Sequence, residues 1–374
     1  MDASGRKTPP LRFQRPNFPS QEAIEAHFKV ARERAWYSNG GPCLEEFSRR
    51  LGERSRSAVL PVANATLALM LGVAALRRDE LGTKVLLPSF TFPAVVEAVL
   101  WNGLEPVFLD ISPGHFHLDP ERLADALAEE DAGVCLVIAG SSFGTPPPPG
   151  VRSAWETECR AAGVQLLVDS AAGFPAVAAD GVPIGSQGDA EVVSFHITKC
   201  FGIGEGGAIF SRDPAVIERI GSLANFGFDE RRSVAIAHGT NAKLDELHAA
   251  VGLAVLGEID SRIKARQASA AKIIEALGSA YVPQMGHELG TYQFVSLLAP
   301  SATDRDRILR AADGIVQLRT YYEPLHRFPA FSDVGSFGDL SVTEEVASRI
   351  VSLPMFDDIT EEERLVICDV VRPL

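Results

Sequence analysis

The amino-acid sequence predicts an α/β protein. We expect a three-layer α/β/α large domain with a mostly parallel sheet, followed by a smaller C-terminal α+β domain. From about residue 55 onward, short runs rich in Val, Ile and Leu alternate with helical patterns. These runs are apolar at successive positions, as strands buried on both faces require. After about residue 240 the pattern changes to a long helical stretch and then shorter mixed elements.

The predicted strands and helices follow one another in regular order. Asn64 is a candidate N-cap for the helix after the first strand, and Asp119 with Pro120 is predicted to begin another. Gly163 is predicted to end a third helix. The strands are expected at residues 58–62, 84–88, 105–111, 133–139, 164–168, 191–195 and 207–211.

Two domains are expected from the length of 374 residues. We predict that residues 1–245 hold an N-terminal arm and the large domain, and that residues 246–374 form the small domain. A long helical stretch is predicted over roughly 241–278. The low-complexity patch Pro146–Pro149 is predicted to lie in a loop.

Composition disfavours several classes of protein. Lysine and arginine number 35 against 49 aspartates and glutamates, a net charge of −14 that disfavours binding to nucleic acid or to an anionic membrane. The five cysteines are scattered without a C-x-x-C pair, which fits neither a disulfide framework nor a metal site. The N-terminus lacks a signal-peptide core, and no apolar run is long enough to span a membrane. We therefore expect a cytoplasmic protein.

Reactive side chains follow the predicted strands, where sites form in parallel sheets. Asp169 ends the strand VQLLVD, Ser194 lies in EVVSFHITK, and Lys199 precedes the glycine-rich segment CFGIGEGG. A partly buried lysine can act as a nucleophile, and a buried carboxylate can hold a cofactor ring nitrogen protonated. Taken singly, Lys199 also fits a surface lysine and Asp169 a helix-capping residue.

Two further segments suit a bound cofactor. Asn64, Ala65 and Thr66 open a helix directly after a strand, and free N–H groups there attract a phosphate. An ordinary N-cap is the alternative. Phe92 in PSFTFPA is placed to stack on an aromatic ring, or to pack in the core.

These motifs together resemble the DegT/DnrJ/EryC1/StrS family of sugar aminotransferases, which use pyridoxal 5′-phosphate (PLP) and have fold type I. The resemblance runs from about residue 20 to the C-terminus. The motifs occur in the family's order: YSNGGPCLEEF, NATLAL, PSFTFPA, EPVFLDI, VDSAAGF, SFHITKCFGIGEGG, NAKLDELHAAVGL, PLH and SLPMF.

The resemblance implies a role for each matching residue. Lys199 matches the lysine that binds the cofactor covalently, Asp169 the acid on its ring nitrogen, and Phe92 the stacking aromatic. Phosphate contacts are implied for Thr66, the Leu67 backbone and Ser194. Asn241 matches an asparagine that reaches the phosphate of the neighbouring subunit, which implies a homodimer with shared active sites.

The implied reaction moves an amino group from L-glutamate to a keto-sugar carried by a nucleotide. Candidate substrate contacts are His196, Arg319, Tyr321 and His326, although each also fits a packed or surface residue. A cyclitol ketone remains an alternative acceptor. Lys199 argues against the family's dehydratases, which carry histidine there, and together with Asp169 against a non-catalytic member. A dehydrogenase fits poorly because no G-x-G-x-x-G follows the first strand.

Two positions depart from the family pattern. Ala172 stands where the family often has histidine or glutamine near the cofactor ring. Ser141 and Ser142 lie in AGSSFG, where a segment with histidine is common. Neither change removes Lys199 or Asp169, so we expect transamination to remain possible.

Overall fold

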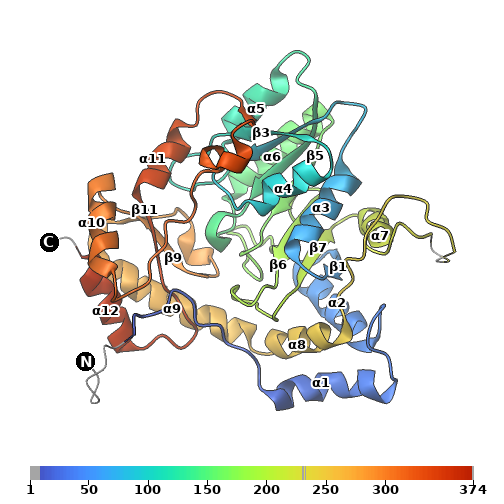
Figure 1. The fold of residues 1–374 in the computed structure, drawn as a ribbon, viewed down its shortest axis with the longest axis horizontal. Coiled ribbons are helices and arrows are strands. Elements are labelled where there is room, and N and C mark those ends of the chain that lie inside the picture. Colours follow the sequence, from blue (N-terminus) through green and yellow to red (C-terminus); the bar gives the residue numbers. More distant parts are fainter. Residues whose placement is uncertain (1–8, 230, 232, 373–374) are drawn as a thin grey trace.

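The computed structural model describes residues 9–229, 231 and 233–372, and an eight-stranded sheet forms its centre (Figure 1). Each neighbouring pair of strands is parallel except at β7, which runs antiparallel to both β1 and β6. Across the sheet the strands are β1 (Ala58–Val62), β7 (Gly207–Ser211), β6 (Ala190–Ser194), β5 (Gln165–Asp169), β4 (Val134–Gly140), β2 (Lys84–Pro88), β3 (Glu105–Leu109) and β10 (Gly335–Ser336).

Helices cover both faces of this sheet, so the predicted three-layer α/β/α architecture is confirmed. Side chains alternate between the faces along each strand: Leu87 packs with one helical layer and Leu86 with the other. One layer contains α3 (Ala65–Leu76), α4 (Ala94–Trp101) and α7 (Pro214–Leu223). The other contains α2 (Pro42–Ser55), α5 (Pro120–Ala128), α6 (Pro149–Ala162) and α8 (Glu246–Leu256).

Most predicted helix ends are confirmed. The Asn64 side chain accepts a hydrogen bond from the N–H of Leu67, Asp119 caps α5, and Gly163 ends α6 in the left-handed region. In the described part of the chain, no helix combines the length and the apolar character needed to cross a membrane.

Three predicted boundaries were wrong. The helical stretch expected over 241–278 is two helices, α8 and α9 (Ile259–Leu277), and Asp245 caps the first of them. Pro149 begins α6 instead of lying in a loop, because proline suits the first turn of a helix. The strand expected over 105–111 ends at Leu109.

A second core surrounds a three-stranded sheet near the C-terminus. Its antiparallel strands are β11 (Ile350–Leu353), β9 (Val295–Leu298) and β8 (Val282–Pro283). Around it lie α9, α10 (Ala302–Ala312) and α12 (Glu361–Val371), and α11 (Ser341–Arg349) leads into β11. The N-terminal arm binds this region: the Leu11 N–H donates a hydrogen bond to the Ile315 carbonyl, and Arg15 donates one to Glu363 at 2.6 Å. The arm then leads to α1 (Gln21–Glu33).

Helix α8 packs with the large sheet, beside α1 and α2 (Figure 1). The buried Glu246 carboxylate at its start accepts hydrogen bonds from the N–H groups of Gly41, Cys43 and Leu44, at 3.0, 2.7 and 3.1 Å. It therefore caps α2, whose own N-cap residue has no side chain. The domain boundary at 245/246 stays a prediction. Because of this packing, we propose a boundary after α8.

Candidate active site

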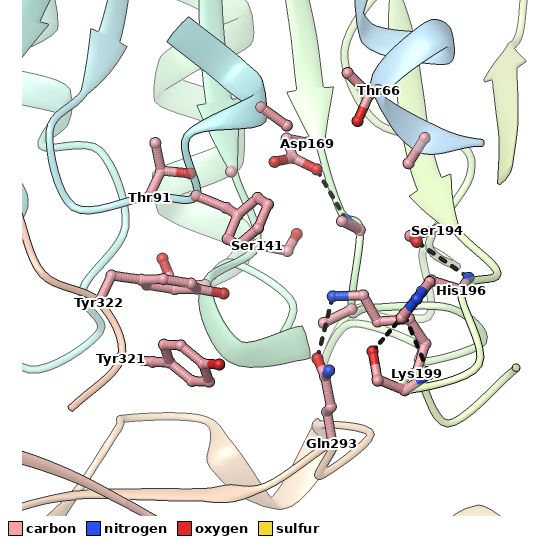
Figure 2. A pocket seen from close by; sticks show the side chains of 18 of the residues that line it. Thr66, Thr91, Ser141, Asp169, Ser194, His196, Lys199, Gln293, Tyr321 and Tyr322 are labelled. Carbon is pink, nitrogen blue, oxygen red and sulfur yellow. Dashed lines mark hydrogen bonds between the residues drawn. The ribbon is translucent and has the colours of Figure 1, made fainter. Parts of the chain in front are cut away.

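A pocket of about 420 Å³ opens where the strands β2, β4 and β5 end. Its wall includes the start of α3, the loop after β6 and side chains from the C-terminal region (Figure 2). The pocket therefore lies at the edge of the sheet where the sequence places its reactive residues.

Asp169 is the last residue of β5 and faces the pocket. One carboxylate oxygen accepts a hydrogen bond from the Ala171 N–H at 3.0 Å. Burial raises the pKa of Asp169, whereas the Ala171 N–H and the charge of Lys199 lower it. A carboxylate held here is stabilised by a cationic partner. This arrangement fits a protonated pyridine nitrogen.

Lys199 enters the same pocket from the loop after β6, and its Nζ donates a hydrogen bond to Oε1 of Gln293 at 3.2 Å (Figure 2). Burial lowers the pKa of the Lys199 amine, and the charge of Asp169 opposes this shift. A lowered pKa increases the fraction of neutral amine, which is the nucleophilic form. The pocket thus suits covalent attachment of an aldehyde.

The start of α3 supplies a site for an anion. Asn64, Ala65 and Thr66 line the pocket beside Ser194. The first N–H groups of a helix attract a phosphate. A Cβ on Gly207 would lie 2.6 Å from the Ala65 nitrogen, so only glycine permits β7 to approach α3 this closely. The Leu67 N–H donates a hydrogen bond to the Asn64 side chain at 2.9 Å, and its predicted contact with a phosphate stays a prediction.

Aromatic side chains form the opposite wall (Figure 2). Phe92 is 56% exposed and lines the pocket instead of packing in the core. Tyr321 also lines it, as predicted for a substrate contact. Tyr322 stacks on Phe143 with ring centroids 5.2 Å apart and an interplanar angle of 6°. These rings can cover a planar cofactor and a sugar.

Not every predicted site residue reaches the pocket. His196 does, with its Nδ1 2.8 Å from Oγ1 of Thr198. His326 instead lies between Oγ of Ser89 and Oε1 of Glu344, at 2.8 and 2.6 Å. Arg319, which stacks over Phe13, Asn241, which is exposed, and Leu67 also lie outside the pocket lining.

Several pocket residues lay outside the sequence prediction. Gln293 comes from the segment before β9, far along the chain from Lys199, and no local pattern marks it. Tyr322 could have been found as the neighbour of Tyr321. The unusual Ser141 and Ala172 both line the pocket, so the two departures from the family pattern lie in the site itself. The pocket also includes Gln14, Thr91, Thr198, Glu205 and Phe294.

Comparisons with known proteins agree with this geometry. Residues 20–372 match the DegT/DnrJ/EryC1/StrS aminotransferase family. The dTDP-4-amino-4,6-dideoxy-D-glucose transaminase of Shigella dysenteriae is 27% identical, over 98% of this chain and 99% of that protein.

Two solved structures are similar over nearly the whole chain. A Bacillus cereus protein assigned as a PLP-dependent aminotransferase has a TM-score of 0.88 and 32% identity, covering 97% of this chain and 99% of its own. DesI, solved in the presence of its TDP-sugar product, has a TM-score of 0.87 and 32% identity, covering 98% and 93%. The expected fold type I is therefore confirmed, and this chain belongs to the DegT/DnrJ/EryC1/StrS family of PLP-dependent aminotransferases.

Proposed function

We propose that this enzyme transfers an amino group from L-glutamate to a keto-sugar carried by a nucleotide. The observation that carries the proposal is one pocket in which Lys199, Asp169 and the start of α3 converge. The reported TDP-sugar product of DesI and the substrate of the Shigella transaminase support the nucleotide-linked acceptor.

Each residue of the site has a distinct task in this proposal. PLP, when bound, acts as an electron sink for the bond that breaks at the amino-bearing carbon. Asp169 holds a proton on the ring nitrogen. Lys199, once its amine is free, would take the proton from the donor's α carbon and deliver it to the cofactor carbon that carried the aldehyde. Thr66 and Ser194 orient the phosphate, and Phe92 covers the ring.

A second copy of the chain would complete the substrate site. Among the residues that line the pocket, the basic side chains are those of Lys199 and His196. In this proposal Lys199 is used in the reaction, which leaves His196 as the basic side chain for the diphosphate of a nucleotide. Charged donors such as Arg and Lys bind phosphates most strongly, so we expect further positive charge from elsewhere. We infer a homodimer in which each subunit lends residues to the other. The exposed Asn241 is the candidate for a contact with the cofactor phosphate of the neighbouring subunit.

An apolar surface supports this dimer. Tyr37, Phe226 and Leu247 are 52%, 48% and 47% exposed. They belong to neighbouring segments, since the Tyr37 carbonyl accepts a hydrogen bond from the Glu246 N–H and Lys243 lies over the Phe226 ring. Exposed aromatic groups of this kind mark interaction surfaces. We further infer a cytoplasmic enzyme, because all five cysteines are unpaired and buried.

The test separates the two half-reactions. L-Glutamate is added to the PLP-loaded protein, and the absorbance of the bound cofactor is followed; we expect it to fall. A dTDP-linked 4-keto or 3-keto sugar is then added, and we expect the absorbance to return. Lys199→Ala should abolish both changes, and Lys272→Ala, at an exposed lysine of α9, should not.

Each failure has its own meaning. No response to glutamate would contradict the donor. A normal response to glutamate, with recovery by a cyclitol ketone and not by the nucleotide-linked sugars, would contradict the acceptor.

A further inference from the structure

A fully buried carboxylic acid lies behind the pocket. Glu191, in the middle strand β6, is 0% exposed. One carboxyl oxygen accepts hydrogen bonds from the N–H groups of Gly185 and Gln187, at 2.6 and 2.9 Å. The other is bonded to Oγ of Ser170 and lies 3.2 Å from Nε2 of Gln187. The reaction proposed above gives this group no task.

Two serine hydroxyls connect Glu191 to the pocket. Oγ of Ser170 lies 2.8 Å from Oγ of Ser141, and both side chains are buried. Ser141 lines the pocket on the side of Asp169 (Figure 2). Two consecutive hydrogen bonds thus run from the interior carboxyl group to Ser141 at the edge of the site.

The number of protons fixes which group donates in each of these hydrogen bonds. When Glu191 is ionised, Ser170 must donate its single hydroxyl proton to the carboxylate. Ser170 can then only accept from Ser141, so Ser141 turns its lone pairs to the pocket. A protonated Glu191 reverses both hydrogen bonds, and Ser141 becomes a donor to the pocket.

We propose that Glu191, Ser170 and Ser141 form a proton relay that sets the protonation of the cofactor group facing Ser141. In the forward step Oγ of Ser141 would take up a proton from the bound cofactor. The proton of Ser141 moves to Ser170, and the proton of Ser170 moves to Oε1 of Glu191. One proton is transferred, no electrons are, and the reverse step restores the start.

The surroundings of Glu191 suit this task. Burial raises its pKa to about 7, although hydrogen bonds from Ser170, Gln187 and Gly185 lower it. Its neighbours in the adjacent strands are Val168 and Phe210. In the described part of the chain, the groups that shift this pKa are donors and not charges. The charged or titratable acid and base side chains at the pocket end are those of Asp169, Lys199, His196 and Glu205.

The relay rests on the proposed function only in that PLP is bound. It does not depend on the amino donor or on the sugar acceptor. The experiment therefore uses the PLP-loaded enzyme without substrate, and measures the pH midpoint of the cofactor's absorbance change. The variants are Glu191→Gln, Ser170→Ala, their combination, and Ser141→Ala. Ser186→Ala is the control, because its buried hydroxyl bonds to Pro183 in the same loop, outside the relay.

Glu191→Gln should reverse the relay permanently. The amide oxygen must face the backbone N–H groups of Gly185 and Gln187, so the NH₂ group faces Ser170 and donates. Ser141 then donates to the pocket and stabilises the deprotonated cofactor group. We expect the midpoint to fall by about half to one pH unit, the size of one exchanged hydrogen bond.

The double variant separates a relay from a distant charge effect. If the hydroxyls transmit the change, Glu191→Gln should shift the midpoint by less than about 0.2 pH unit once Ser170 is alanine. An equal shift in both backgrounds would overturn the relay, as would an unchanged midpoint in folded, PLP-loaded Glu191→Gln or Ser141→Ala.

Discussion

Burial shifts the pKa of three acid–base side chains in and behind the pocket, and each shift disfavours charge. The pKa values of Asp169 and Glu191 are raised, and that of Lys199 is lowered. For Asp169 and Lys199 the shift concerns the proposed chemistry, because both groups line the pocket. Glu191 lies outside the pocket lining. Because its pKa differs between the folded and the unfolded protein, its titration changes the stability of the protein.

The stability of the protein should depend on pH through Glu191. Its pKa is about 7 in the folded protein, against about 4.5 for an ordinary glutamate. A raised acid pKa stabilises the fold below pH 4.5, and this stabilisation is lost as the pH rises towards 7 and above.

Denaturant unfolding of the wild type and Glu191→Gln at pH 5 to 8 would measure this effect. The wild type should lose free energy of unfolding relative to the variant, at up to about 1.4 kcal/mol per pH unit. A constant difference between the two proteins over this range would show that Glu191 titrates normally.

At the scale of elements, the phosphate site depends on how closely β7 approaches α3. Gly207→Ala would place a Cβ 2.6 Å from the Ala65 nitrogen and 2.8 Å from the Asn64 carbonyl carbon. Backbone atoms at such distances must move, which displaces the start of α3. We expect PLP affinity to fall roughly ten-fold or more, measured by equilibrium titration of cofactor-free protein.

The matched control for that change is Gly150→Ala. A Cβ there meets no atom within 4 Å, and the residue lies in the first turn of α6. Its PLP affinity should equal that of the wild type. If Gly207→Ala also binds PLP normally, the start of α3 does not hold the phosphate.

A second contact between distant elements is the cap that Glu246 provides for α2. Glu246→Gln keeps the shape of the side chain but turns an NH₂ group towards at least one N–H donor at the start of α2. We expect the free energy of unfolding to fall by about 1–3 kcal/mol. Glu275→Gln, at an exposed position of α9, is the control. Equal stability of both variants would contradict the cap.

These elements explain which parts could be predicted from sequence. Strands β1 to β7 and the caps at Asn64 and Asp119 depend on short windows of sequence. Each of them was predicted, although the strand expected over 105–111 ends at Leu109. Pocket residues from the C-terminal part depend on long-range packing. Gln293 reaches Lys199 across 94 positions, and Ser89 holds His326 across 237. No local pattern contains such information.

At the scale of the whole molecule, the proposed homodimer concerns a residue that lies outside the pocket. Lys199, Asp169 and the aromatic wall line one pocket of a single chain. Asn241 is outside that pocket, on a segment bridged to Asn225 and next to the exposed Phe226. If Asn241 contacts a cofactor phosphate, as we propose, it would do so in the pocket of a neighbouring subunit.

Mixing two defective subunits tests this sharing directly. Lys199→Ala and Asn241→Ala should each transfer amino groups from glutamate poorly when alone. In a mixed dimer, the site that retains Lys199 would receive Asn241 from the other subunit and would be intact. Random mixing makes half of the dimers mixed, so we expect about a quarter of the wild-type activity per site. If Asn241 served its own subunit, neither site of the mixed dimer would be intact and mixing would restore nothing. Light scattering on the same samples would show whether dimers had formed.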